Sequence, residues 1–275
     1  MNQSIIAASV SMSGLQQKLN VIAVNVANID TAGYKRKTAS FSDVLTTVQQ
    51  QLSDFELPGR ATPLGYTNGY GSRLSSVMRD FTQGSLVTSN LPTDLALEGN
   101  GLFEVTTPNG VAYVREGDFQ LSPVGEGAIL TTRDGYPINT TDNGVIRIQD
   151  GFQMKIDTAG RVYEVNSATN VTNLVGTIRI MQPIKPELLS QIENNLYVIP
   201  QGVNANAVVQ QLDLTNIPAD GIVPLTVRQG VLEKSNVSMS DEMADLIQAQ
   251  RAYQMAARAL SSGDAMWGLA NSIRG

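Results

Sequence analysis

The side chains that could do chemistry in this sequence are its carboxylates, because the chain contains no cysteine and no histidine. Thiol nucleophiles, Ser/His/Asp triads, disulfides and the usual zinc and copper ligands are therefore excluded. Paired carboxylates could still serve a glycoside hydrolase. Two pairs are candidates, Asp94 with Glu98 and Asp134 with Asp142. Because carboxylates at turns are usually turn formers, we predict no catalytic residue and no enzyme.

Phosphate and metal sites are equally weak candidates. The loop Glu98-Gly99-Asn100-Gly101 lacks the Lys-Ser/Thr ending of a P-loop and the full dinucleotide spacing. Acidic loops at Asp142-Asn143 and Asp150 could hold calcium, but neither matches the EF-hand pattern. We predict no cofactor, no metal site and no small-molecule substrate.

Composition limits the possible partners. The 275 residues carry 19 basic and 25 acidic side chains, a net charge of -6, with no basic stripe. Nucleic acid is therefore not an expected partner. Because 42% of the residues are hydrophobic and only 16% are charged, we expect a folded core and a lightly charged polar surface suited to repeated self-contact. The length allows one large domain or two ordinary ones.

The elements that position these residues begin with an N-terminal helix. Apolar residues separated alternately by three and four positions form a heptad seam: Ile5, Ala8, Met12, Leu15, Leu19, Ile22, Val26 and Ile29. A second apolar strip, which calls for more than one neighbouring helix, comprises Ile6, Val10, Val21 and Val24. The pattern ends at residues 30–33, and we interpret the following run Lys35-Arg36-Lys37 as a solvated cluster that could also bind an acidic patch on a neighbouring subunit.

A C-terminal helix mirrors the first one and is predicted from Ser238 to about Ser272. At ~1.5 Å per residue it would be ~50 Å long, and the N-terminal helix ~40 Å. Met243 and Ile247 widen its apolar stripe. Its seam comprises Leu246, Ala249, Tyr253, Ala256, Leu260, Gly263, Trp267 and Ala270. We predict that the two seams mediate self-association.

The intervening sequence predicts antiparallel strands. Hairpin turn signals recur at Asn109-Gly110, Asp134-Gly135, Asn143-Gly144 and Asp150-Gly151. Strands are expected at residues 101–105, 111–114, 144–148 and 176–181. The predicted fold is α+β, with long terminal helices forming a coiled-coil-like domain and a central antiparallel all-β domain. We place the boundaries at 1–45 for the N-terminal helix and turn, 46–84 for an extended arm, 85–230 for the β domain and 231–275 for the C-terminal helix.

Three signatures resemble those of the bacterial flagellar rod and hook protein family. The first runs from Ala27 through Asn28, Gly33, Tyr34 and Lys35 to Arg36, and the second contains Gly99, Gly101, Phe103 and Arg115. The third includes Ser235 and Asn236 and continues to Gln250, Arg251 and Tyr253. The signatures stand in the family's order and span nearly the whole chain. Within this family the chain most resembles distal rod subunits. Departures occur at Gln254 and Gly268.

The resemblance implies a structural subunit that stacks helically into a hollow, torque-transmitting tube. It also implies that the terminal helices form the inner wall and that the partners are further copies, other rod and hook proteins and the flagellar export apparatus. The implied location is the basal body, outside the cytoplasm and reached without a cleaved signal.

Three alternatives to a rod subunit remain. The chain could be a hook subunit or a proximal rod subunit of the same family. It could also be a secreted protein that binds cell-wall polysaccharide. In the free monomer we expect loose terminal segments, with tryptic cleavage after Lys18, Lys35, Arg36, Arg251 and Arg258.

Overall fold

The computed structural model describes residues 2–43, 46–50, 65–69, 71–125, 127–166, 171–192, 195–212, 214 and 225–273. The chain forms two compact units. The helical unit contains Met1–Ala27, Lys37–Met78 and Ser238–Gly275, and the β unit contains Asn28–Arg36 and Arg79–Val237. Both units are therefore built from segments that lie far apart in the sequence.

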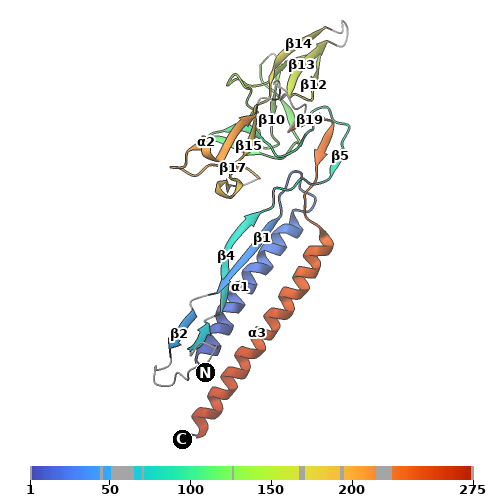
Figure 1. The fold of residues 1–275 in the computed structure, drawn as a ribbon. Helices are drawn as coiled ribbons and strands as arrows, with labels where there is room; N and C mark the ends of the chain where they lie inside the picture. Colours follow the sequence, from blue (N-terminus) through green and yellow to red (C-terminus); the bar gives the residue numbers. More distant parts are fainter. Residues whose placement is uncertain are drawn as a thin grey trace, which may run out of the picture. The chain divides into compact units, whose positions relative to one another are not determined.

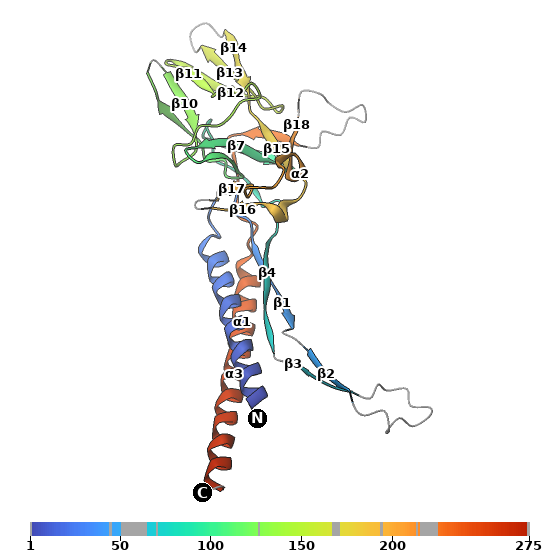
Figure 2. The ribbon, with the colours of Figure 1, turned by 90° about the vertical axis from the view of Figure 1, so that its left-hand side faces the viewer.

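Two long helices run side by side in opposite directions through the helical unit (Figures 1 and 2). They are α1, Asn2–Ala27, and α3, Met239–Ile273. Strands β1, Lys37–Asp43, and β4, Ser72–Arg79, form a two-stranded sheet, and β2, Thr46–Gln50, pairs antiparallel with β3, Gly65–Gly69. Neither these helices nor any other helix among the described residues has a stretch apolar and long enough to cross a lipid bilayer.

Close backbone approach fixes the chain before β4 on α1. Gly71 has a φ of +97°, and a Cβ atom there would lie 2.7 Å from the carbonyl oxygen of Ala7. A Cβ on Gly14 would lie 3.1 Å from the carbonyl oxygen of Ser72. Only a residue without a side chain fits at position 71, so glycine permits this packing.

The β unit is built from antiparallel strands. Its largest sheet has the order β16-β17-β8-β7-β15-β18. These strands are Ser190–Gln191, Tyr197–Val198, Gly110–Val114, Leu102–Thr107, Ile180–Pro183 and Val209–Leu212. Two short helices, η2 at Pro186–Leu188 and α2 at Ala205–Val208, lie in the connections.

Smaller sheets complete the β unit. One has the order β11-β10-β9, with strands Arg147–Gln149, Gly127–Thr131 and Gln120–Pro123. Another has the order β12-β13-β14, with strands Phe152–Ile156, Arg161–Asn166 and Thr172–Thr177. Strand β19, Thr226–Gln229, pairs with β6, Leu95–Glu98, and β20, Val231–Glu233, pairs with β5, Leu86–Thr88.

One apolar core connects these sheets. Phe103 is fully buried and meets Phe119 edge to face, with ring centroids 5.1 Å apart. Other fully buried members include Leu95, Val105, Leu130, Ile138, Ile146 and Val162. Since the members come from β6, β7, β10 and β13 and from the loops between strands, this cluster joins several of the sheets, and a second, smaller cluster contains Leu102, Tyr113, Leu189, Tyr197, Val208 and Val209.

The predicted α+β fold class is confirmed, with terminal helices and a central β-rich region. The C-terminal helix and the strands at 101–105 and 111–114 lie where the sequence predicts them. Of the predicted strand 144–148, only its last two residues lie in a strand, β11. The domain limits at 45, 84 and 230 stay predictions, and residues 44–45 and 51–64 of the first boundary and the arm lie outside the described residues.

Two element predictions were wrong in detail. The expected strand 176–181 is divided between β14 and β15, because Ile178 N–H donates to Gly160 O and Arg179 N–H donates to Asn139 O. Ile29 does not extend the N-terminal helix, which ends at Ala27. A turn follows instead, in which Thr31 N–H donates to Asn28 O.

Candidate functional site

The predicted self-association residues lie mostly at intermediate depth. Ile22 on α1 and Ala249 on α3 are buried, and a Cβ on Gly263 would lie 3.0 Å from Ile5 Cγ1. The half-buried seam residues of the helices are Ile5, Ala8, Met12, Leu15, Leu19, Val26, Leu246, Tyr253, Ala256 and Leu260. Trp267 is 46% exposed, and Ile29 lies half-buried in the β unit. Packing of one helix on the other within one chain therefore leaves part of each seam uncovered.

Larger apolar side chains project into solvent from both helices. On α1, Ile6 is 47% exposed and Val24 40%. On α3, exposed apolar residues are Met239, Met243, Ile247, Met255, Met266, Trp267 and Leu269. We call Met243, Ile247, Met255 and Leu269 the outer strip. Ile247 is two residues from the buried Ala249, which is about 200° of helical rotation, so the two side chains lie on nearly opposite faces of α3. Covering the outer strip requires atoms from outside this helix pair.

A buried polar contact fixes the two helices in the helical unit. The Asn25 side-chain amide donates to Glu242 Oε1 over 3.2 Å and to Lys37 O over 2.8 Å, and it accepts from Lys37 N–H over 2.9 Å. Asn25 and Glu242 are each 1% exposed. Because a buried polar side chain tolerates few alternative positions, this contact favours one register of α1 on α3.

The three sequence signatures meet inside the β unit, at a site we call the polar junction. Lys35 Nζ lies 2.7 Å from Glu233 Oε1, and Arg115 Nε lies 2.6 Å from Glu233 Oε2. All three side chains are at most 4% exposed. A single carboxylate from the C-terminal signature thus pairs with one cation from each of the other two.

Backbone groups satisfy the rest of the polar junction. Lys35 Nζ also donates to Thr82 O over 2.8 Å, and Arg115 donates to Leu97 O over 2.8 Å and to Gly101 O. Gly84 N–H donates to Glu233 Oε1 over 2.9 Å. Burial lowers the pKa of Lys35 below its ordinary value, opposed by the Glu233 carboxylate, which favours the charged amine.

The chain around Lys35 is held as tightly as its side chain. Gly33 has a φ of +66°, and a Cβ there would lie 2.7 Å from the backbone of Arg115. Asn236 accepts from Arg36 N–H over 2.7 Å and donates to Asp80 O over 2.8 Å. The prediction that Lys35-Arg36-Lys37 is a solvated cluster was wrong for Lys35, because its amine is buried against Glu233 of the same chain.

The remaining signature residues have varied places. Tyr34 is buried, Asn28 is half-buried, and Ser235 accepts from Val237 N–H over 3.3 Å. Gly99 takes a φ of +116° beside β6, whereas Gln250 and Arg251 are exposed on α3. Glu233 was missed as a site residue. A cation in each of the first two signatures, about 80 residues apart, and a carboxylate in the third signature were the signal that could have found Glu233.

The candidate catalytic carboxylates have other partners. Glu98 pairs with Arg228 over 2.8 Å, both side chains being about half-exposed, and accepts from Thr226 Oγ1. Asp94 is buried, and Asp134 lies exposed in a turn with Gly135. Among the described residues, no group of three or more acidic side chains could hold a metal ion. Asp134 thus lies in a turn, as expected of a turn former, whereas Asp94 is buried.

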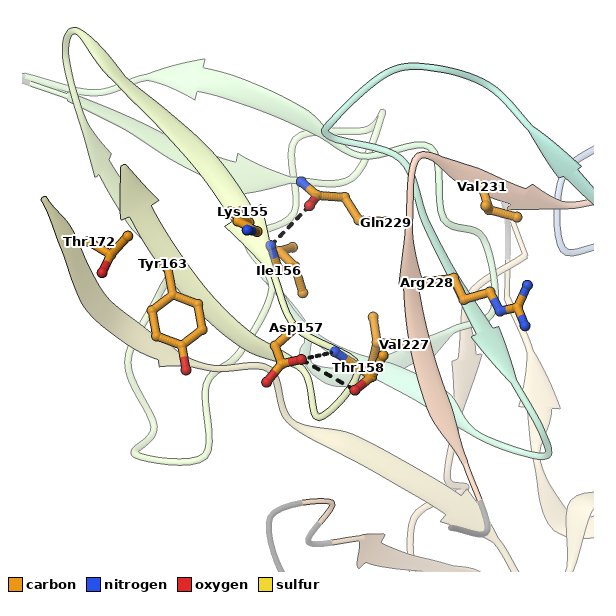
Figure 3. A pocket seen from close by; sticks show the side chains of 10 residues that line it. All are labelled: Lys155, Ile156, Asp157, Thr158, Tyr163, Thr172, Val227, Arg228, Gln229 and Val231. Carbon is orange, nitrogen blue, oxygen red and sulfur yellow. Dashed lines mark hydrogen bonds between the residues drawn. The ribbon is translucent and has the colours of Figure 1, made fainter. Parts of the chain in front are cut away.

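A pocket of about 530 Å³ opens between β12, β13, β14 and β19 (Figure 3). Its lining includes Ile156, Tyr163 and Val227, and Gln229 Oε1 accepts from Ile156 N–H over 3.0 Å. Its one carboxylate belongs to Asp157, which accepts from Thr158 N–H over 2.7 Å. That hydrogen bond holds the pKa of Asp157 below its ordinary range, and Arg161 also lowers it. One ionised carboxylate does not supply the acid and base that glycoside hydrolysis requires.

Antiparallel helices with uncovered apolar strips, and a β unit that joins residues 28–36 to residues 230–237, fit the class of structural proteins that assemble through helix faces. Family models agree with this class. They match the C-terminal domain of flagellar basal body rod proteins FlgE/F/G at residues 228–273, the flagellar hook protein FlgE/F/G D1 domain at 96–168 and the flagella basal body rod protein at 7–35.

Curated relatives match almost the whole chain. The flagellar basal-body rod protein FlgG of Borreliella burgdorferi is 31% identical over 100% of this chain and 99% of its own length. The flagellar hook-basal body complex protein FlhP of Bacillus subtilis is 30% identical over 100% of both chains, and FlgG of Caulobacter vibrioides is 30% identical over 99% of both. The chain belongs to the flagellar basal-body rod protein family, which confirms the predicted structural role in the rod.

Proposed function

We propose that the protein is the repeating subunit of a flagellar rod, in which copies stack helically into a hollow tube that transmits torque. The outer strip carries this proposal, since four large apolar side chains stay 41% to 65% exposed although α1 and α3 are paired. At ~25 cal/mol per Å² of apolar surface, covering the strip with neighbouring copies favours assembly. The full-length match to proteins named basal-body rod proteins supports the same role.

The helix pair suits the wall of such a tube. The heptad seams of α1 and α3 support coiled-coil packing, and their half-buried residues leave surface for a neighbouring subunit. The partners we propose are further copies, other rod and hook proteins and the flagellar export apparatus, and the location is the extracytoplasmic part of the basal body. The family membership that supports this function also favours it over a polysaccharide-binding protein.

The subtype proposed is a distal rod subunit. Relatives named FlgG span the whole chain, but one named as a hook-basal body complex protein has nearly the same identity. A hook or proximal rod subunit is therefore the second candidate. Immunogold labelling of isolated basal bodies separates them, because the label falls on the distal rod, on the proximal rod or on the hook.

Electron microscopy of the concentrated pure protein tests the function. We expect tubes from the unchanged protein and none from Ile247→Asp, since a carboxylate in an apolar contact costs several kcal/mol. Gln248→Asp adds the same charge at the neighbouring exposed position and serves as the matched control. Absence of tubes under all conditions, or equal loss with both variants, would contradict assembly through the outer strip.

A further inference from the structure

We propose that the β unit contains a docking site for the chain's own N-terminal segment 28–36, and that Glu233 couples occupancy of this site to docking of the C-terminal segment 230–237. Residues 28–36 are separated from the rest of the β unit by more than 40 residues of the helical unit. They nevertheless pack inside the β unit. The proposal goes beyond assembly and concerns the free chain.

Shape complementarity of backbone defines the first part of the site. Gly33 N–H donates to Glu233 O over 2.8 Å, and Asp80 N–H donates to Arg36 O over 2.9 Å. The surface at Arg115 and Glu116 leaves no room for a Cβ on Gly33. The docked segment is therefore bound at both ends of the sequence Gly33-Tyr34-Lys35-Arg36, with Tyr34 buried between them.

Charge defines the second part. Lys35 enters the site as a buried ammonium whose carboxylate partner, Glu233, belongs to the C-terminal segment. Without Lys35, Glu233 keeps Arg115 and the Gly84 N–H but loses one of its two cations. Without the C-terminal segment, Lys35 and Arg115 are two buried cations with no carboxylate between them. Each terminal segment therefore binds more tightly when the other is present.

Coupling of this kind is reciprocal by thermodynamic necessity. Segment 28–36 follows α1 directly, and segment 230–237 directly precedes α3. The chain thus fixes the end of α1 and the start of α3 together or not at all. A subunit with one free end would not present a complete helix pair for assembly.

Hydrogen exchange of the full chain, below the concentration of assembly, tests the coupling in one direction. Lys35→Met should accelerate exchange in residues 230–236 at least tenfold, including the Lys234 N–H that donates to Ser85 O, while β7 and β8 stay unchanged. Lys155→Met, the same substitution at an exposed lysine, is the matched control and should change neither region.

Chemical labelling tests the other direction. Gly230→Ala strains segment 230–237 without touching segment 28–36, because Gly230 has a φ of +71° and a Cβ there would lie no closer than 3.9 Å to a neighbouring atom, Leu91 O. This variant should raise the rate of Lys35 acetylation by an N-hydroxysuccinimide ester at least tenfold relative to Lys155. Effects confined to the substituted segment would overturn the coupling. Acceleration spread evenly over β7 and β8 would also overturn it, since that result reports loss of overall stability. Neither readout depends on tube formation, so failure of the proposed function leaves this test intact.

Discussion

At the scale of single residues, Glu233 holds together the two buried ion pairs of the polar junction. Glu233→Gln leaves two buried cations without a carboxylate, and breaking a buried ion pair in this way costs about 3–5 kcal/mol. We expect a loss of that size in the free energy of unfolding, measured by urea denaturation and circular dichroism.

Glu98→Gln is the matched control for this prediction. Its pair with Arg228 is about half-exposed, and solvent-screened pairs contribute roughly 0–1 kcal/mol. Equal losses for the two variants would show that burial of the polar junction adds nothing to its strength.

Glu116 gives the β unit a pH dependence that a chain without histidine would otherwise lack between pH 6 and 8. Burial, together with the nearby carboxyls of Asp118 and Asp134 and against the opposing Arg133, raises the pKa of Glu116 from 4.5 to about 8. Between these two values the folded chain binds more protons than the unfolded chain. The free energy of unfolding should therefore fall as the pH rises from about 4.5 to about 8.

Glu116→Gln should flatten this slope. Urea denaturation at pH 5, 7 and 9 measures it, and we expect the variant to gain stability over the original chain at the two higher values. Glu187→Gln, at an exposed carboxyl on η2, should keep the slope. If the free energy of unfolding of Glu116→Gln still falls with rising pH, another titratable group causes the slope.

At the scale of elements, the Asn25 contact fixes how α1 lies on α3. Asn25→Ala leaves the Lys37 backbone and Glu242 without the partners that Asn25 supplies, and an unsatisfied buried group costs about 1–3 kcal/mol. We expect a lower melting temperature of the helical circular dichroism signal. Asn20→Ala, at an exposed position of α1, should change the free energy of unfolding by no more than about 0.5 kcal/mol and leave the melting temperature nearly unchanged. Identical melting of the two variants would contradict the role of Asn25 in register.

The half-buried seam has a separate prediction. Leu19→Asp or Leu260→Asp places an unpaired carboxylate between the helices, which costs several kcal/mol, and should abolish assembly. The β unit has its own core and should keep its circular dichroism signal. The conservative variants Leu19→Met and Leu260→Met are controls and should still assemble. Loss of the β-sheet signal in the Asp variants would contradict the independence of the two units.

Sequence periodicity predicted the helices and fold class because heptad spacing and turn glycines are local signals. The seam of α3 and the hairpin at Asn109-Gly110, where Gly110 takes a φ of +124°, are examples. The polar junction could not be predicted in the same way. Its ion pairs join residues 118 and 198 positions apart, and nothing local to Lys35 distinguishes a buried amine from a solvated one. The prediction that Ile29 continues the helix was wrong for a related reason. Residues 28–36 pack in the β unit, so the helix ends before its apolar pattern does.

At the scale of the whole molecule, the two units should differ in stability before assembly. Part of each helix's apolar surface has no partner in one chain, so packing offsets less of the ~1–2 kcal/mol per residue of backbone ordering entropy. Trypsin should therefore cut the free monomer first after Lys18, Arg251 and Arg258.

The burial of Lys35 changes the expectation drawn from sequence. The peptide bond after Lys35 lies in the docked segment and should resist cleavage like those after Arg147 and Arg179 in the β unit. Mass spectrometry of timed digests measures the order, with tubes as the comparison in which the helix sites become protected. Cleavage after Lys35 as fast as after Arg258 would mean that the N-terminal segment leaves the β unit in the free chain, and resistance of the helix sites in the monomer would mean that the helix pair needs no neighbour.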